Sequence, residues 1–306
     1  MVPDFDIQEA LGTKGTGSMD RATALAVATT GRLLDDATGN RVVDTDQLTA
    51  IVLGTTSGSA RTQMDFTRAT LTRRKPYLVE PSMMPFALMN SAAGQCAIRH
   101  QIVGPNSSLG GGRVSGLLAL SYAARLLASG RASTVVCGSV EEFSPDRALL
   151  ESSIDPSSGV LGEGCAVFLI EPSRSTGTPL AEVLMSYSRI CVDGDYTAAF
   201  SACLRHVLSG VNAAEVWAIA LSPEAGPVTD AERQAVDDRF RGTGTKPRRI
   251  RPSELIGDTG AAAASFQTAA LLSIAEESPE ARGKLAIVTS AERDGSVACA
   301  LLRMPS

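Results

Sequence analysis

The sequence is poor in the residues that metal and nucleic-acid chemistry need. It has only two histidines, His100 and His206, and none of its six cysteines forms a Cys-x-x-Cys pair, which argues against a zinc site. Aromatic residues make up 4% of the chain, too few for base-stacking platforms. The 28 Lys and Arg are outnumbered by 33 Asp and Glu, a balance that argues against a nucleic-acid partner. We therefore expect no metal, no cofactor and no nucleic acid.

Long apolar runs and a leader segment are also missing. No apolar run reaches the roughly 18 residues of a membrane-spanning helix, and the acidic start at residues 1–6 lacks the basic and apolar regions of a signal peptide. The cysteines mostly lie in apolar segments, where reduced thiols act as small hydrophobic side chains. We expect a cytoplasmic protein without membrane contact, and 306 residues suffice for a full-sized core.

What the sequence does contain is an alternation of strand-like and helix-like segments. Apolar residues at helical spacing predict helices, and continuous apolar runs predict buried strands. The predicted helices are 19–36, 86–100, 114–128, 197–209, 230–240 and 260–275. The predicted strands are 50–55, 133–139, 165–171, 181–190, 216–221, 248–251, 284–290 and 296–303. Residues 172–179 have the polar, turn-rich composition of a linker, which divides the chain into halves at 1–174 and 175–306.

Several short motifs follow one another through the first half. Asn90-Ser91-Ala92-Ala93-Gly94-Gln95 leads to Gly104-Pro105-Asn106, then Gly138-Ser139-Val140-Glu141 and Gly162-Glu163-Gly164 flank the next two strands. In this order they resemble the β-ketoacyl synthase family of the thiolase fold over most of residues 14–190. The resemblance implies an α/β fold in which two βα-rich halves are related by a pseudo-twofold axis and stack in five layers, αβαβα.

The catalytic residues of that family are missing from the matching positions. The nucleophilic cysteine would lie just before the third helix, where this chain has Arg113, and a guanidinium cannot attack a thioester as a thiolate does. The first catalytic histidine would lie within 222–230, which contains none, and Asp258 stands near the place of the second. His100 and His206 belong to other segments. We expect no catalytic residue in this chain.

The same resemblance places Arg113 and Asp258 at the former active-site hollow. A buried guanidinium needs a carboxylate partner, and the pair favours bidentate geometry. We predict that Arg113 pairs with Asp258 or with Glu224 and fills the hollow. The alternative is that these are solvated loop residues.

Because this chain lacks the cysteine and the histidines at the matching positions, it resembles the chain-length factor, the β-subunit of type II polyketide synthases. The resemblance implies a non-catalytic subunit that forms a heterodimer with an active β-ketoacyl synthase, in polyketide or fatty-acid-like biosynthesis, and that shapes or stabilises its acyl tunnel. Three departures leave the tunnel open to question. Arg113 stands where those subunits often carry Gln, the usual opening strand and part of the second half are missing, and Asp294-Gly295-Ser296 replaces a Gly-Phe gate.

Two further groups of residues are candidates for contacts with partners. A Met-rich segment suits either core packing or the tunnel and dimer interface, and its candidates are Met83, Met84, Phe86, Met89 and Gln95. Basic clusters in an acidic protein suit either a solvated face or the docking of an acidic acyl carrier protein, and their candidates are Arg73, Arg74, Arg248 and Arg249. Glu163 and Asp20-Arg21 match the family pattern with a structural role.

Two alternative functions stay open. One is an acyl-binding homodimeric pseudoenzyme. The other is an acyltransferase or thioesterase of altered chemistry that uses Ser115 or Cys165 as nucleophile and an Asp or Glu as base, although no histidine can be assigned to either nucleophile.

Overall fold

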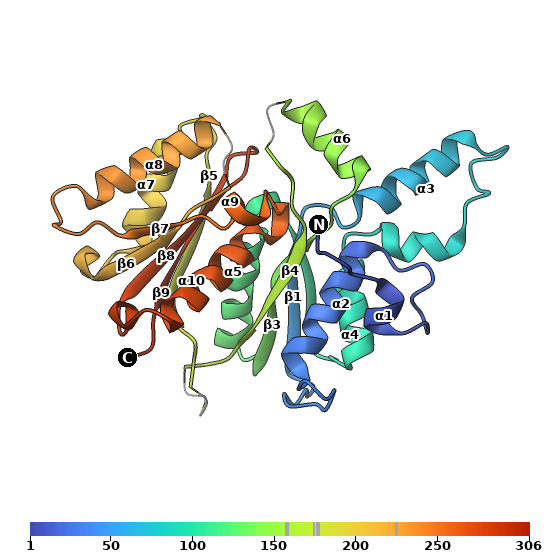
Figure 1. The fold of residues 1–306 in the computed structure, drawn as a ribbon, viewed down its shortest axis with the longest axis horizontal. Coiled ribbons are helices and arrows are strands. Elements are labelled where there is room, and N and C mark those ends of the chain that lie inside the picture. Colours follow the sequence, from blue (N-terminus) through green and yellow to red (C-terminus); the bar gives the residue numbers. More distant parts are fainter. Residues whose placement is uncertain (157–158, 174, 176–177, 224–225) are drawn as a thin grey trace.

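Two sheets organise the computed structural model, which describes residues 1–156, 159–173, 175, 178–223 and 226–306 (Figure 1). The strands of the first sheet are β1 (Thr49–Thr55), β2 (Asn106–Gly110), β3 (Thr134–Glu141) and β4 (Gly164–Ile170). Their order is β2-β1-β3-β4. β1 runs parallel to β2 and β3, whereas β4 runs antiparallel to β3.

The second sheet repeats this pattern and adds one strand. Its strands are β5 (Glu182–Ile190), β6 (Val216–Ala220), β7 (Arg248–Ile250), β8 (Leu285–Ala291) and β9 (Ser296–Arg303). Their order is β5-β9-β8-β6-β7. β6 runs parallel to β7 and β8, and β9 runs antiparallel to β8, as β1 to β4 do in the first sheet. This repetition confirms the predicted relation between the halves.

Helices fill the space between the two sheets and cover their outer faces. The principal ones are α2 (Arg21–Leu34), α4 (Ser91–His100), α5 (Ser115–Ala128), α7 (Tyr196–Val207), α8 (Pro227–Phe240) and α10 (Ala263–Glu276). α5 and α10 share one core with both sheets, α2 and α4 share a second core with the first sheet, and α7 and α8 share a third with the second sheet. The predicted five-layer αβαβα fold is therefore confirmed (Figure 1).

Small residues bring the central layer close to the sheets. A Cβ atom on Gly54 of β1 would lie 2.6 Å from the Cβ of Ser115, the first residue of α5. A Cβ on Gly116 would lie 2.7 Å from the Oγ of Ser265 in α10. Glycine at these two positions lets β1, α5 and α10 meet near the start of both central helices. The candidate site lies at this junction.

The predicted elements match the observed ones best where a buried face or a cap defines them. Helix 19–36 is α2, because the Asp20 side chain accepts the Thr23 amide at 2.8 Å and caps its first turn. The predicted helix 86–100 begins too early, since 81–87 is a 3-10 turn that contains Pro85 and α4 begins at Ser91. Four α-helices were not predicted, namely α1 (Ile7–Leu11), α3 (Ala60–Thr72), α6 (Pro145–Ile154) and α9 (Ser253–Ile256). The shorter 3-10 turns are η1 (Pro81–Ala87), η2 (Gly112–Val114), η3 (Ala213–Glu215), η4 (Gly260–Ala262) and η5 (Pro279–Ala281).

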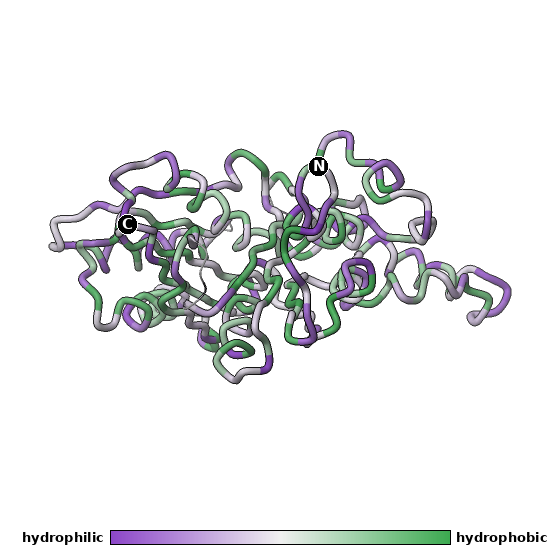
Figure 2. Tube along the Cα trace, turned by 90° about the horizontal axis from the view of Figure 1, so that it is seen from below, coloured by the Kyte–Doolittle hydropathy of each residue, from purple (hydrophilic) through white to green (hydrophobic). Residues whose placement is uncertain are grey.

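The helix α3 and the segment that follows it extend away from the layers, and we call residues 60–90 the α3 arm. Only Ala60 of α3 is buried, and the sequence of the helix is mostly polar, so its few apolar residues do not predict a helix that packs on a core. Figure 2 shows that this arm projects at the right and that its tip is hydrophilic, whereas hydrophobic segments are frequent in the body of the molecule. Among the described residues, no helix is long and apolar enough to cross a membrane.

Candidate functional site

Arg113 occupies the junction between the two halves, in the 3-10 turn η2 that leads into α5. Its side chain is 4% exposed. Its Nε donates a hydrogen bond to Oδ2 of Asp258 at 2.9 Å, and its Nη2 donates to the same oxygen. Asp258 lies just before η4, which opens α10. The predicted pair between Arg113 and Asp258 is confirmed, while the alternative partner Glu224 lies outside the described residues.

A second carboxylate, Glu292, completes the cluster and was not predicted. Its Oε2 accepts the backbone amide of Arg113 at 2.9 Å, and its Oε1 accepts Nη1 of Arg113 at 3.0 Å. Glu292 follows the last residue of β8 and lies two residues beyond the end of the predicted strand 284–290. Its place in the sequence, directly after a buried strand, does not by itself point to Arg113, which is 179 residues away in the chain. Gly112 makes room for it, because a Cβ there would overlap with Glu292.

Arg113 and Asp258 favour each other's charged forms. Burial alone would raise the pKa of Asp258, but the charge and hydrogen bonds of Arg113, together with the Gly260 amide, lower it overall. Burial likewise opposes the charge on Arg113, and the two carboxylates raise the pKa of the guanidinium above its ordinary value. Arg113 therefore stays positively charged, and its guanidinium is paired with the carboxylates of Asp258 and Glu292. It can neither act as a nucleophile nor give up a proton.

Arg293, the next residue along the chain, fastens the same hairpin to α6. Its Nη1 lies 3.0 Å from Oε2 of Glu151, and its Nη2 lies 3.5 Å from Oδ2 of Asp155. The Tyr196 hydroxyl donates to the backbone oxygens of Glu292 and Arg293, each at 3.0 Å. These contacts hold the turn between β8 and β9, which includes Asp294 and Gly295.

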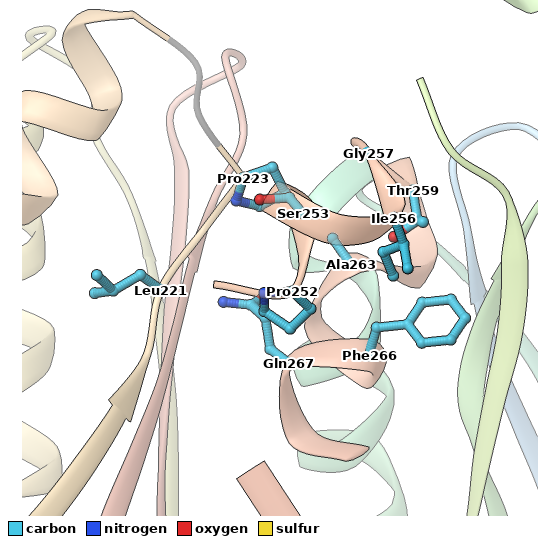
Figure 3. A pocket seen from close by; sticks show the side chains of 10 residues that line it. All are labelled: Leu221, Pro223, Pro252, Ser253, Ile256, Gly257, Thr259, Ala263, Phe266 and Gln267. Carbon is cyan, nitrogen blue, oxygen red and sulfur yellow. The ribbon is translucent and has the colours of Figure 1, made fainter. Parts of the chain in front are cut away.

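A small cavity lies beside the cluster, between the segment around α9 and the start of α10. Figure 3 shows Thr259, Ala263 and Phe266 among the residues that line it. Its volume of about 10 Å³ is that of one water molecule and too small for an acyl chain.

Among the described residues, neither alternative nucleophile is hydrogen-bonded to a His, Asp or Glu side chain. Ser115 is fully buried, and its Oγ donates to the backbone oxygen of Thr55 at 3.1 Å. Burial raises the pKa of the Cys165 thiol, which opposes thiolate formation. His100 bonds the Val27 carbonyl oxygen at 2.9 Å in an outer layer, and His206 stacks on a tyrosine in the opposite outer layer. Neither histidine shares the central layer with Ser115.

Most of the interface and tunnel candidates lie on the α3 arm, with different exposures. Phe86 is buried against Met19 and Ala24, so core packing accounts for it. Met83 is half-buried, whereas Met84 and Met89 are exposed. Gln95, outside the arm on α4, is half-buried.

The two basic clusters are far apart in the fold. Arg73 and Arg74 are exposed on the α3 arm, whereas Arg248 and Arg249 lie on β7, at the outer edge of the second sheet (Figure 1). Arg249 pairs with Asp237. The structure does not bring the four arginines into one surface.

Glu163 has the structural role that its sequence context predicts. Its Oε1 lies 2.7 Å from Nη2 of Arg21, and its carboxylate also accepts the amides of Val2 at 2.7 Å and Phe143 at 2.9 Å. Burial would raise the pKa of Glu163, but these donors lower it overall. The carboxylate ties the start of the chain to the segment that enters β4. Among the described residues, no group of three or more His, Cys, Asp or Glu could hold a metal ion.

Comparison with known proteins agrees with this arrangement. Residues 4–175 match the family described as "Beta-ketoacyl synthase, N-terminal domain". The 3-oxoacyl-[acyl-carrier-protein] synthase 2 of Rhizobium meliloti (strain 1021) is 26% identical over 208 residues, which are 60% of this chain and 49% of that protein. The tetracenomycin polyketide synthase ketoacyl synthase alpha subunit of Streptomyces glaucescens is 28% identical over 195 residues, 55% of this chain and 46% of that protein. The chain thus spans about half the length of these curated relatives.

Solved structures extend the similarity to the second half. The ishigamide ketosynthase/chain length factor is 46% identical with a TM-score of 0.93, over 100% of this chain and 86% of that one. A chain of AntDE:AntF, a type II PKS acyl-carrier protein in complex with its ketosynthase, has a TM-score of 0.80 over 99% of this chain and 89% of that one. At 17% identity, the second similarity is one of fold alone.

Proposed function

Because the chain belongs to the β-ketoacyl synthase family, we propose that it is a non-catalytic, chain-length-factor-like subunit that forms a heterodimer with an active β-ketoacyl synthase. In this proposal the partner supplies the cysteine and the histidines of a type II polyketide or fatty-acid-like synthase. This chain stabilises the partner and contributes to the wall of its acyl tunnel. The observation that carries the proposal is the buried cluster of Arg113, Asp258 and Glu292 at the place of the nucleophile.

The chemistry of this cluster supports a non-catalytic role. The amides at the start of a helix favour an anion and lower the pKa of a thiol placed there. At the start of α5 this chain has a cation instead, and Glu292 supplies the negative charge by accepting the Arg113 amide. An incoming thioester would have to displace a buried ion pair to reach this point, which is energetically costly.

The α3 arm supports a role in assembly. Large apolar side chains that are exposed on it and just beyond include Leu71, Tyr77, Leu78, Met84, Leu88, Met89 and Ile98. The arm adjoins β2, because Met89 Cε would lie 3.1 Å from a Cβ on Gly110, the last residue of that strand. β2 is an edge strand that pairs with β1 alone among the described strands. An apolar surface beside an open strand edge is typical of a protein–protein interface.

A docking role for the arm's basic tip is a second, smaller proposal. An acidic acyl carrier protein would be attracted by the exposed Arg73 and Arg74, which lie next to Lys75. Arg249 is the weaker candidate because it already pairs with Asp237. Charge reversal of Arg73 and Arg74 should therefore slow carrier association more than reversal of Arg248 and Arg249, and more so at low salt.

Co-expression with an active ketosynthase tests the main proposal. We expect a 1:1 complex by light scattering and condensation activity that is lost when the partner's cysteine is changed to alanine. With Arg113→Gln in this chain, the condensation rate per assembled 1:1 complex should stay within a few-fold of that of the unchanged complex. A stable homodimer that ignores the partner would favour the acyl-binding pseudoenzyme instead. Thioester hydrolysis by this chain alone, lost in Ser115→Ala, would favour the altered enzyme.

A further inference from the structure

The α3 arm leaves the body of the molecule and returns to it at one place. A Cβ atom on Gly58, just before the arm, would lie 2.9 Å from the Cα atom of Met89, near its end. The start of the arm is held by Glu142, whose carboxylate accepts the Ser59 hydroxyl at 3.0 Å and the Arg61 amide at 3.1 Å. Glu142 directly follows β3, so this end of the arm is bonded to the first sheet.

The end of the arm lies against the start of α2. In Figure 1 the arm runs back from α3 toward α2 and α4. Phe86 is buried and packs in one apolar cluster with Met19, the residue before the capping residue Asp20. Ser91, the first residue after the arm, has its Oγ 3.1 Å from Oγ1 of Thr23, and the same Oγ1 lies 2.5 Å from Oδ2 of Asp20. Asp20 is 8% exposed, and the end of the arm helps to exclude water from its carboxyl.

Burial disfavours the charge on Asp20. It raises the pKa of this carboxyl to about 6, against the hydrogen bonds that Thr23 donates, and the charge of Glu142 adds to the increase. An ionised carboxylate gains stability from water, and water reaches Asp20 when the end of the arm moves away. Ionisation of Asp20 and displacement of the arm therefore favour each other.

Other charged groups around the start of α2 are bound to different partners or exposed. The guanidinium of Arg21, the next residue, binds both oxygens of Glu163. Titratable side chains of the neighbouring elements are exposed or bonded elsewhere, among them Asp6, Glu9, Arg61, Arg99, His100 and Glu141. A charge that does act on Asp20 is that of Glu142, the residue that holds the start of the arm.

The hydroxyl of Thr23 links the charge of Asp20 to the arm. It has a single hydrogen and lies within hydrogen-bonding distance of both Asp20 and Ser91. An ionised carboxylate only accepts, so it takes this hydrogen, whereas a protonated carboxyl donates its own hydrogen to Oγ1 and leaves that of Thr23 for Ser91. On ionisation the proton passes to solvent water, and Thr23 no longer donates to Ser91.

From these contacts we infer that Asp20 is a pH-sensitive switch for the position of the α3 arm. With Asp20 protonated, the end of the arm stays packed on α2. When Asp20 ionises, this end moves away and admits water to the carboxylate, and repulsion between Asp20 and Glu142 adds to the displacement. The consequence for assembly rests on the proposed function, because a partner that binds the arm is then bound more weakly at high pH than at low pH.

Methionine methyl signals report the position of the arm in the full chain without a partner. Met83, Met84 and Met89 lie on the arm, whereas Met185 lies on β5 and Met304 follows β9. In a chain labelled with ¹³C at the methionine methyl groups, we expect the arm signals to shift with one midpoint near pH 6, where Asp20 titrates. The signals of Met185 and Met304 should not shift with this midpoint.

Three variants assign the midpoint. Asp20→Asn should abolish the shift of the arm signals, and Glu142→Gln should move its midpoint to lower pH, because loss of the neighbouring negative charge favours ionised Asp20. Asp6→Asn, at the exposed cap of α1, is the matched control and should change nothing. If an altered Met304 signal shows that Asp20→Asn is misfolded, the direction of the midpoint shift in Glu142→Gln decides. Arm signals that do not move between pH 4.5 and pH 7.5, or that move equally in Asp20→Asn, would overturn the inference.

Binding to the ketosynthase separates this inference from the proposed heterodimer. We expect the Kd of the complex to rise on the order of tenfold from pH 5.5 to pH 7.5, and much less in Asp20→Asn. Equal pH dependence of the Kd in both chains would overturn the consequence for assembly. Arm signals that titrate in a chain that binds no ketosynthase at either pH would support the switch and reject the heterodimer.

Discussion

Arg113 directs two of its nitrogens, Nε and Nη2, at a single oxygen of Asp258, while the other oxygen of that carboxylate accepts the amide of Gly260. Two segments 145 residues apart in the chain are thus joined by one buried ion pair. The pair links the start of α5 in the first half to the turn before α10 in the second. Its role in the fold can be measured independently of any partner.

Arg113→Ala should cost about 3–5 kcal/mol in the free energy of unfolding, since it leaves buried carboxylates without their cation. Urea denaturation at neutral pH measures this loss. In the double variant Arg113→Ala/Asp258→Ala the loss should be smaller than the sum of the two single losses, because the second change removes one of the uncompensated charges. Additive losses would show that the pair contributes no coupling.

Gly112→Ala should destabilise the protein by about 1–3 kcal/mol, a typical cost of a strained backbone conformation. Its φ is +53°, in the left-handed region, and a Cβ there would overlap with Glu292. The matched control is Gly94→Ala in α4, where a Cβ meets nothing within 4 Å. That change should be neutral or stabilise by about 0.5–1 kcal/mol. Thermal unfolding of both variants would refute the argument if Gly112→Ala were the milder change.

The succession of strands along the chain could be predicted from the sequence because it depends on continuous apolar runs. The cluster partner Asp258 could be predicted because it depends on the order of the family's motifs. Glu292 could not be predicted, since its position depends on where β8 ends and on the close approach that Gly112 permits. The α3 arm was missed for a different reason. Its helix buries only Ala60 and is mostly polar, so it lacks the apolar content from which core-packed helices are recognised.

Asp20 makes the stability of the protein depend on pH. Burial raises its pKa from 3.8 to about 6, against the hydrogen bonds from Thr23. A carboxyl whose pKa is higher in the folded state contributes stability that is fully present below pH 3.8 and is lost as the pH rises through about 6. The loss is on the order of 3 kcal/mol.

Asp20→Asn should remove this pH dependence while retaining a capping oxygen for α2. The free energy of unfolding, measured at pH 4.5 and pH 7.5 by urea denaturation, should differ less between the two pH values in this variant than in the unchanged protein. Asp6→Asn, at the exposed cap of α1, serves as the control and should leave the difference as it is. An undiminished difference in Asp20→Asn would assign the pH dependence to another group.

Polar substitutions on the α3 arm should separate assembly from folding. Leu71 and Tyr77 are 79% and 69% exposed, so Leu71→Ser and Tyr77→Ser should change the free energy of unfolding by less than about 0.5 kcal/mol. If a ketosynthase partner covers the arm, each truncation removes apolar contact area from the complex, and a central anchor of this kind is worth about 2 kcal/mol. The Kd of the complex should then rise on the order of tenfold or more for the stronger of the two variants.

The control for the arm is Val192→Ser, which removes a side chain that is 91% exposed in the second half. Val192 follows β5, a strand of the second sheet, and the proposed interface lies on the first sheet. Surface plasmon resonance with an immobilised ketosynthase compares the three variants under identical conditions. Equal affinities for all three variants would show that the arm is not part of the interface. A surface that is buried in a complex loses binding free energy when its large apolar side chains are truncated. A selective loss in the arm variants, with unfolding curves that superimpose, would place the partner on the β2 side of the first sheet.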